Sequence, residues 1–261
     1  MPNTKNRIKI AKSFDLAINS YDVSARLQRY TGKHLMPWLP NKNDLTVIDL
    51  GCGTGFFSEI LASRYQSVIG VDISNKMLNF TRENRNKDLR LVAGDAYHLP
   101  FRDNSIDLIY SNLVIQWCDP LEHAVEEIMR VLKPGGTFVF TTLLDQTLSE
   151  LKSAWSQVDD DKHVIDFKRD IEVLGAFQKE NSTMLEYKVQ DVVLEYENVI
   201  HLARELKGLG ANHVPKKANR GLAGKEKWQK MTKAYEDFIE PTGIYPATYK
   251  VFSGVAVKLN D

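Results

Sequence analysis

The amino-acid sequence predicts a doubly wound α/β domain, in which a parallel sheet lies between layers of helices. Between residues 44 and 143, short β-branched runs alternate with helical patterns, which is typical of βαβ units. The runs are continuously apolar, as in strands that are buried on both faces. A glycine-rich segment follows the first run, and domains of this type bind ligands beyond the carboxyl ends of their strands.

Five strands are predicted in this core. They are Thr46–Leu50, Ser67–Asp72, Leu89–Ala93, Ile106–Tyr110 and Thr137–Leu143. Amphipathic helices are expected between them, and the clearest covers 121–132, where apolar residues recur at helical spacing. Lys133-Pro134-Gly135-Gly136 is expected to end this helix and to form the turn before the fifth strand.

One domain with insertions can contain all 261 residues. Its predicted parts are a helical N-terminal cap (1–43), the core (44–143), helices on the substrate side (144–183 and 197–242) and the last two strands (184–196 and 247–259). The cap places Phe14, Ala17 and Tyr21 on one helical face. The polar segment 145–181 has helical character without a strand, which indicates an insertion or lid.

Composition excludes several classes of protein. Lys+Arg and Asp+Glu both number 34, so the formal net charge is zero, unlike that of a general nucleic-acid binder. The sequence has neither a secretory signal nor a run of apolar residues that could span a membrane. Its two cysteines, Cys52 and Cys118, fit a reducing compartment better than a disulfide scaffold. We expect a soluble cytoplasmic protein without a metal site.

The first strand leads into Asp49-Leu50-Gly51-Cys52-Gly53-Thr54-Gly55, and a helical pattern follows. Glycines let the chain turn sharply and approach a ligand closely, while the helix N-terminus offers amide groups and partial positive charge. A dinucleotide fingerprint requires its third glycine one residue later, where Phe56 stands. The loop therefore predicts a nucleotide-type cofactor that has no pyrophosphate.

The glycine loop resembles motif I of class I S-adenosylmethionine-dependent methyltransferases. Val71-Asp72, Gly94-Asp95-Ala96 and the segment 130–136 extend this resemblance in the order and spacing of that superfamily. It implies a Rossmann-like class I methyltransferase sheet, S-adenosylmethionine as cofactor, Asp72 at the ribose hydroxyls and Asp95 beside the adenine amino group. Met77 packs against either the adenine or the core. The predicted cofactor-binding residues are Asp49, Gly51, Gly53, Gly55, Asp72, Ile73, Met77, Asp95, Ala96 and Asn112.

Four flanking segments bear on the methyl acceptor. They are Phe14–Ala17 with Tyr21, Ser111–Cys118, Arg204–His213 and Gly243–Tyr249. Together they resemble the malonyl-[acyl-carrier protein] O-methyltransferase family of the biotin pathway over nearly the whole chain. This resemblance implies methyl-ester formation on the free carboxylate of a malonyl thioester, which the fatty-acid machinery then elongates as a disguised primer.

The implied chemistry needs few catalytic groups. A malonyl carboxyl group has a pKa of roughly 3–4, so it is ionised at neutral pH and requires no general base. Tyr21, Gln116 and Trp117 are suited to align the acceptor and exclude water. Arg204 is the candidate cation for the carboxylate, with an exposed helix arginine as the alternative. His213 either bonds the thioester carbonyl or is a structural loop histidine.

Other functions stay open at this point. A methyltransferase for a quinone or another small acid, and a cofactor-binding protein without catalysis, are the two alternatives. An acyl-carrier protein is acidic, so a neutral partner must present a local basic surface. The predicted docking residues are Lys216, Lys217, Arg220, Lys225, Lys227 and Lys230. The segment 159–163 has no motif that indicates a role.

Overall fold

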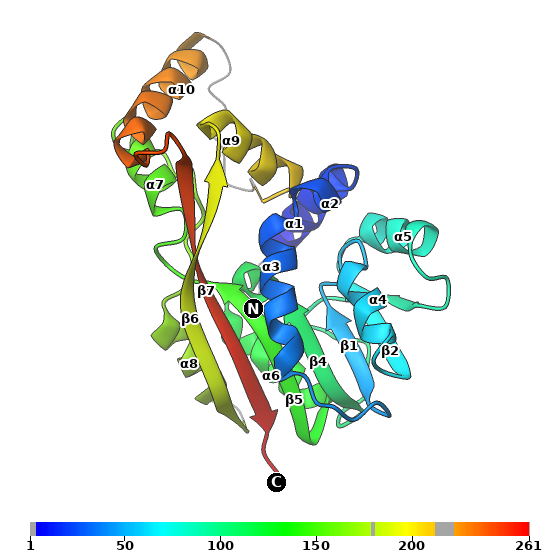
Figure 1. Cartoon of the computed structure of the whole chain (residues 1–261). Coiled ribbons are helices and arrows are strands. Elements are labelled where there is room, and N and C mark those ends of the chain that lie inside the picture. The colour runs from blue at the N-terminus through cyan, green and yellow to red at the C-terminus, as the bar shows by residue number, and fades with distance from the viewer. Residues whose placement is uncertain (1–3, 179–180, 212–221, 261) are drawn as a thin grey trace.

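The computed structural model describes residues 4–178, 181–211 and 222–260. Its centre is a seven-stranded sheet with the order β3-β2-β1-β4-β5-β7-β6 (Figure 1). The strands are β1 (Thr46–Leu50), β2 (Ser67–Asp72), β3 (Arg90–Ala93), β4 (Ile106–Asn112), β5 (Leu132–Leu143), β6 (Ser182–Tyr196) and β7 (Tyr245–Lys258). The pairs from β3 to β5 are parallel, and β7 is antiparallel to both of its neighbours. The predicted doubly wound α/β fold is confirmed.

Helices precede, cover and follow this sheet. The α-helices are α1 (Thr4–Ala17), α2 (Tyr21–Ser24), α3 (Arg26–Leu35), α4 (Phe56–Ala62), α5 (Asn75–Asn84), α6 (Leu121–Val131), α7 (Ser149–Ser156), α8 (Asp170–Gln178), α9 (Val199–Gly208) and α10 (Leu222–Tyr235). Short 3-10 helices are η1 (Met36–Trp38), η2 (Ile115–Trp117) and η3 (Glu236–Phe238). Within the part of the chain that is described, no helix is long and apolar enough to cross a membrane.

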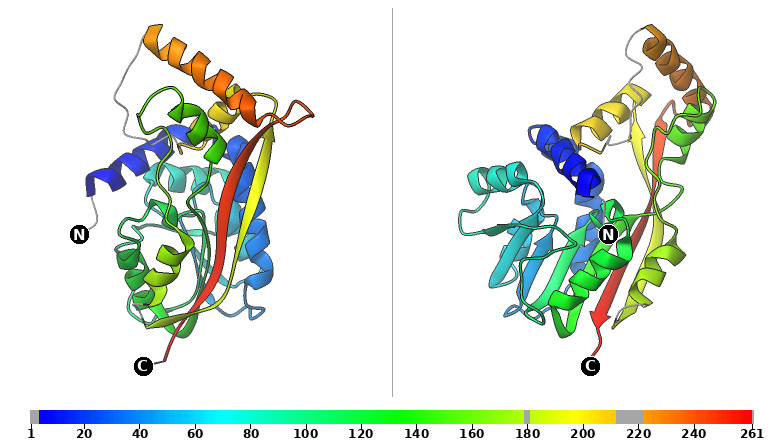
Figure 2. Two further views of the ribbon diagram at one scale, coloured as in Figure 1. Left: turned by 90° about the vertical axis from the view of Figure 1, so that its left-hand side faces the viewer. Right: turned by 180° about the vertical axis from the view of Figure 1, so that it is seen from behind.

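The two faces of the sheet have separate hydrophobic cores. Successive strand residues point to opposite faces, so Ile48 and Ile109 pack toward α6 and α8, whereas Val47 and Leu108 pack toward α3 and α4. Figure 2 shows these helices on both sides of the sheet. Because both faces are covered, the parallel strands contain the continuous apolar runs seen in the sequence.

A third hydrophobic core lies at one end of the two longest strands of the sheet. β6 and β7 extend past the other strands, and α7, α9 and α10 pack around their far ends (Figure 1). Met231 and Tyr235 of α10 and Leu202 of α9 are buried there. These helices and α1–α3 surround the carboxyl ends of β1 and β4, where an α/β sheet binds its ligands.

The predicted turn before the fifth strand is wrong. α6 ends at Val131, and β5 starts at once with Leu132, which pairs with Ile106 of β4. Lys133 Nζ binds Asp107 Oδ1 at 2.7 Å, and the strand register shifts between Ile106 and Leu108. The Lys-Pro-Gly-Gly segment is thus an irregular start of β5, although its local sequence pattern predicts a turn.

Candidate active site

The glycine loop between β1 and α4 is held by backbone contacts with β2. Gly51, Gly53 and Gly55 have φ angles of 71°, 54° and 76°, in the left-handed region that favours glycine. A Cβ on Gly51 would lie 2.3 Å from the side chain of Val114, which is closer than any real contact. The N–H groups of Gly51 and Cys52 both donate to the carbonyl of Val71, at 2.7 and 3.0 Å. These hydrogen bonds attach the loop to the end of β2.

Asp72, the last residue of β2, binds the glycine loop through its carboxylate. Its Oδ2 accepts a hydrogen bond from Gly53 N–H at 2.9 Å, and its Oδ1 accepts one from Ser74 N–H at 2.7 Å. Burial raises the pKa of Asp72, although the hydrogen bonds from Ser74 and Gly53 oppose this shift. Each oxygen has further acceptor capacity, so the carboxylate can still receive hydroxyl donors from a ligand.

Asp49 has a different position behind the loop. Its Oδ2 accepts a hydrogen bond from Ser58 Oγ of α4 at 2.6 Å. Burial raises the pKa of Asp49 to about 7, partly offset by that bond. Asp49 lines a small cavity beside Tyr110 and Phe57 and does not line the large cavity in front of the loop.

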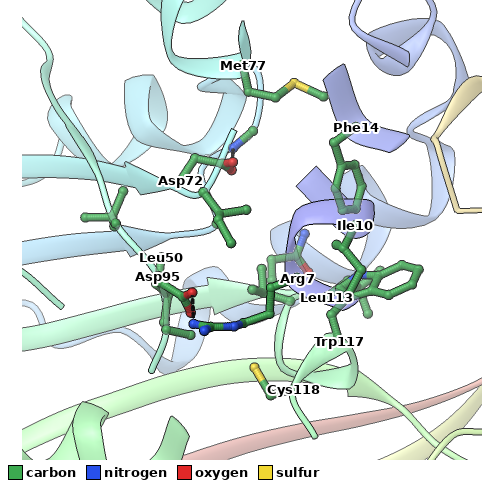
Figure 3. Close-up of a pocket in the computed structure, with 18 of the residues that line it drawn as sticks. Arg7, Ile10, Phe14, Leu50, Asp72, Met77, Asp95, Leu113, Trp117 and Cys118 are labelled. Carbon is green, nitrogen blue, oxygen red and sulfur yellow. Dashed lines mark hydrogen bonds and ion pairs between the residues drawn. The ribbon is translucent and has the colours of Figure 1, made fainter. Parts of the chain in front are cut away.

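The large cavity in front of the glycine loop is called here the loop cavity (Figure 3). Predicted cofactor residues that line it are Gly51, Gly53, Asp72, Ile73, Met77, Asp95, Ala96 and Asn112. Gly55, like Asp49, does not line it. Met77 is buried in the core and also lines the cavity, and its contact with adenine stays a prediction. Asn112 is fixed, since its Oδ1 accepts from Thr31 and Thr141, each at 2.7 Å.

Helix α1 forms a wall of the loop cavity that the sequence did not reveal. Figure 3 shows Ile10 and Phe14 across the cavity from Leu50 and Asp72. Arg7 forms an ion pair with Asp95 and lies over the ring of Tyr97, with its guanidinium carbon 5.4 Å from the ring centre. No local pattern pairs residues 7 and 95, because only the fold brings α1 to the end of β3.

A second cavity continues from the first and is called here the helical cavity. Four residues line both cavities: Phe14, Tyr21, Leu113 and Trp117. Phe14 and Trp117 meet edge to face, with ring centres 5.7 Å apart. Burial raises the pKa of Tyr21, and the negative charge of Asp72 adds to this, so its hydroxyl stays protonated. Of the predicted residues, Tyr21 and Trp117 thus line both cavities, whereas Gln116 lines the helical cavity alone.

Gln116 lines the helical cavity and has a buried amide oxygen without a hydrogen-bond partner among the described residues. Its Nε2 donates to the carbonyl of Leu113 at 2.7 Å. Gln28, on α3, lines the same cavity and also has a buried Oε1 for which the described part of the chain supplies no donor. Buried acceptors without donors are rare, and they mark places where a ligand can bind.

The structure does not bring Arg204 to either cavity. Arg204 is exposed on α9, which turns Glu205, Leu206 and Leu209 toward the helical cavity instead. Glu205 is bound by Arg26 Nη2 at 2.8 Å. The predicted contact of Arg204 with the acceptor carboxylate therefore has no support from its position, because a helix presents neighbouring residues to different sides. His213 lies outside the described residues.

Three of the predicted docking residues are described. Lys225 is exposed, Lys230 forms a surface ion pair with Glu226 at 2.9 Å, and Lys227 binds Asp159 at 2.6 Å. Lys227 is thus engaged within the protein, between α10 and the segment that follows α7. Lys216, Lys217 and Arg220 lie outside the described residues.

The loop cavity fits S-adenosylmethionine in shape and chemistry. Apolar side chains of Leu50, Val71 and Met77 can cover an adenine, and Asp72 offers a carboxylate to a ribose. The left-handed glycines bring the backbone close without a pyrophosphate cradle. Across the described ranges, no group of three His, Cys, Asp or Glu side chains is arranged to hold a metal ion.

Comparison with known proteins gives the family. The Methyltransferase domain family model matches residues 48–140. The chain is 36% identical to the malonyl-[acyl-carrier protein] O-methyltransferase of Yersinia pestis, over 97% of this chain and 92% of the relative. It is 40% identical to the biotin biosynthesis bifunctional protein BioHC of Cellvibrio japonicus over 96% of this chain, and it spans about half (50%) of that longer protein.

Solved structures agree on the fold. A putative methyltransferase from Bacillus halodurans superimposes with a TM-score of 0.63 at 17% identity, covering 88% of this chain and 99% of the other. The resemblance stated from the sequence is confirmed by the sequence relatives, and the Rossmann-like class I methyltransferase fold by the structures. The chain belongs to the malonyl-[acyl-carrier protein] O-methyltransferase family.

Proposed function

We propose that this protein transfers the methyl group of S-adenosylmethionine to the free carboxylate of malonyl-[acyl-carrier protein], which gives the methyl-ester primer for biotin synthesis. The observation that carries the proposal is the junction of the two cavities at Phe14, Tyr21, Leu113 and Trp117. One cavity suits the cofactor, the other suits an acyl group, and they meet where a methyl group could pass. The names of relatives at 35–36% identity over nearly their full length support the same acceptor.

The cofactor is held by the residues of the loop cavity. Gly51 and Gly53 give it room at the backbone, Asp72 binds the ribose hydroxyls, and Ala96 and Met77 lie against the adenine. When bound, the cofactor supplies an electrophilic methyl group on a sulfonium centre. Asp95 would face the adenine edge, and its ion pair with Arg7 joins α1 to this end of the site.

The acceptor needs alignment rather than activation. Its carboxylate is ionised at neutral pH, so no side chain has to remove a proton. The neutral Tyr21 hydroxyl can donate a hydrogen bond that orients the acceptor carboxylate. Gln116, on η2, lines the helical cavity and restricts where the acceptor can lie. Phe14 and Trp117 exclude water from the junction, which strengthens the attraction between the carboxylate and the sulfonium centre.

The test is methyl transfer from labelled S-adenosylmethionine to a panel of acceptors. Malonyl-[acyl-carrier protein] and malonyl-coenzyme A should be labelled, whereas acetyl-coenzyme A, which has no free carboxylate, should not. Free malonate and a quinone complete the panel. Labelling of the quinone alone would assign a different methyltransferase activity, and cofactor binding without any labelled product would indicate a protein that binds the cofactor without catalysis.

For the carrier protein, we propose docking on the basic surface that includes Lys216, Lys217, Arg220, Lys225 and Lys230. This segment follows α9, whose side chains line the helical cavity, so a thioester arm from a docked carrier can reach the acceptor site. Lys227 has a structural role in this proposal, because its ammonium binds Asp159. Arg204 is exposed on α9 and can add to the basic surface.

A further inference from the structure

The helical cavity contains one basic side chain among its described lining residues, His163. The acidic side chain there, Glu205, is neutralised by Arg26. The tyrosines Tyr21 and Tyr249 have pKa values raised by burial, so they stay neutral. Among the described lining residues, an acceptor with a free carboxylate therefore meets one group that can carry positive charge.

The imidazole of His163 is held on two sides. Its ring stacks on the indole of Trp155, with centres 3.6 Å apart and planes inclined by 6°. Its Nε2–H donates to Asp159 Oδ1 at 2.8 Å, and Asp159 Oδ2 binds Lys227 at 2.6 Å. The residues described here provide no hydrogen-bond partner for its Nδ1. The ring is thus fixed by packing and by one nitrogen, which leaves the other nitrogen for a ligand.

An anion that binds at Nδ1 needs a donor on that nitrogen, so the ring that binds it carries a proton on each nitrogen. Lys227 and His163 lower the pKa of Asp159 to about 2, so the group that accepts from Nε2 is a carboxylate at neutral pH. That carboxylate lies at one nitrogen of the ring, and the indole of Trp155 covers one ring face. Asp161 is the other acid nearby, 3.9 Å from the Lys227 ammonium and half exposed. The charge of Asp159 is balanced by Lys227, so the imidazolium can attract a further anion.

We propose that His163 binds the acceptor carboxylate and thereby distinguishes the malonyl thioester from its methyl ester. This inference rests on the proposed function, since it names the residue that recognises the same acceptor. A hydrogen bond from a charged donor to a carboxylate is short and strong, and the neutral ester loses its charge-assisted component. One carboxylate oxygen is held by Nδ1–H, and the other is left for the methyl group. The methylated product then leaves because its anchor is gone.

The experiment compares ligand binding in three variants. His163→Phe keeps a ring against Trp155 but has no nitrogen, and His163→Lys restores a cation. His201→Asn is the matched control, because His201 also contacts a carboxylate four residues earlier, Glu197 at 3.3 Å, but lines neither cavity. Calorimetry with S-adenosylhomocysteine present would measure the affinity of malonyl-coenzyme A and of its methyl ester.

We expect His163→Phe to weaken malonyl-coenzyme A binding at least about tenfold and to leave the methyl ester within about twofold. His163→Lys should recover part of the lost affinity, and His201→Asn should change neither ligand. Equal weakening of both ligands, or no weakening of either, would overturn the proposal. His163→Gln, which removes the charge with a smaller side chain, decides the matter if His163→Phe does not fold.

The two proposals fail in different measurements. If the parent protein binds malonyl-coenzyme A but does not methylate it, the proposed function is wrong, while the variants still report on recognition of the carboxylate. If the parent methylates malonyl thioesters and His163→Phe binds them equally well, only the role of His163 is wrong.

Discussion

Asp72 combines a structural and a ligand-binding position at the end of β2. It orders the glycine loop through Gly53 N–H at 2.9 Å, and its carboxylate lines the loop cavity. We predict that Asp72→Ala weakens S-adenosylmethionine binding by roughly 1.5–3 kcal/mol, as expected when hydrogen bonds to a charged group are lost. Calorimetry would measure this, with circular dichroism to check the fold. Asp88→Ala removes an exposed carboxylate outside the cavity and should bind normally; unchanged affinity in Asp72→Ala would remove the ribose assignment.

Asp49 makes the stability of the fold depend on pH. Burial raises its pKa to about 7 in the folded protein, so between about pH 4 and 7 the folded state binds more protons than the unfolded state. The free energy of unfolding should therefore fall as the pH rises through this range. Asp49→Asn cannot ionise, and we predict that it gains stability relative to the parent on going from pH 5 to pH 8, by on the order of 1–4 kcal/mol.

Urea unfolding at both pH values would measure the effect of Asp49→Asn. The control is Asp44→Asn, which removes an exposed carboxylate paired with Lys42 at 3.5 Å and should show no such pH dependence. A constant difference between Asp49→Asn and the parent at both pH values would mean that Asp49 is ionised throughout.

At the scale of elements, α1 and α2 are fastened to the loops around the cofactor site. Arg7 pairs with Asp95, Ser74 Oγ donates to Asp15 at 2.6 Å, and Asp22 binds both Thr54 and Arg85 at 2.6 Å. These contacts hold the wall that contains Phe14 and Tyr21 against the glycine loop. A cofactor that enters or leaves the loop cavity must pass elements that are joined by polar contacts.

We predict that Asp22→Asn speeds dissociation of S-adenosylhomocysteine by about three- to tenfold, because it weakens the contacts of α2 with Thr54 and Arg85. Stopped-flow displacement would measure the rate. Asp145→Asn removes a carboxylate that pairs with Lys152 at 3.5 Å and lines neither cavity, so it should leave the rate unchanged. An unchanged rate in Asp22→Asn would show that α2 does not control exit from the site.

Elements were predictable where a local pattern decides them. β1 and β2 have the predicted bounds, since their apolar runs end at sharp polar or glycine boundaries. β5 starts five residues before the predicted Thr137, at Leu132, because pairing with Ile106 of the neighbouring strand overrides the Pro-Gly-Gly signal. Arg7 was missed because its partner Asp95 comes from a distant segment, so no spacing along the chain predicts the pair. His163 contacts Trp155 and Asp159 within its own segment, but only the fold brings that segment to the helical cavity.

At the scale of the whole molecule, the two cavities are lined by different parts of the fold. The parallel strands carry the loop cavity, the proposed cofactor site, at their carboxyl ends. The helical cavity, the proposed acceptor site, is lined by residues of α1–α3, α7, α9 and β7, which together span more than 200 residues of the sequence. Substrate choice is therefore a property of the entire chain.

The net charge of zero makes carrier docking depend on a local surface. We predict that reversing Lys216, Lys217 and Arg220 to glutamate raises the KM for malonyl-[acyl-carrier protein] and flattens its dependence on salt. Rim charges act mainly on association, and their attraction to an acidic partner is screened by salt. Malonyl-coenzyme A needs no docked protein, so its KM should change little.

The matched control reverses three exposed cations on or near the edge strand β3, Arg82, Lys87 and Arg90, which gives the same change in net charge. Steady-state assays with both thioesters at low and at physiological salt would separate the possibilities. If the 216–220 variant and the control raise the KM for the carrier equally, net charge rather than a docking surface governs the encounter. If the 216–220 variant loses activity equally on both thioesters, the segment serves the acceptor cavity itself. Carrier recognition then depends on other cations, of which exposed Arg204 and Lys207 on α9 are the next to reverse.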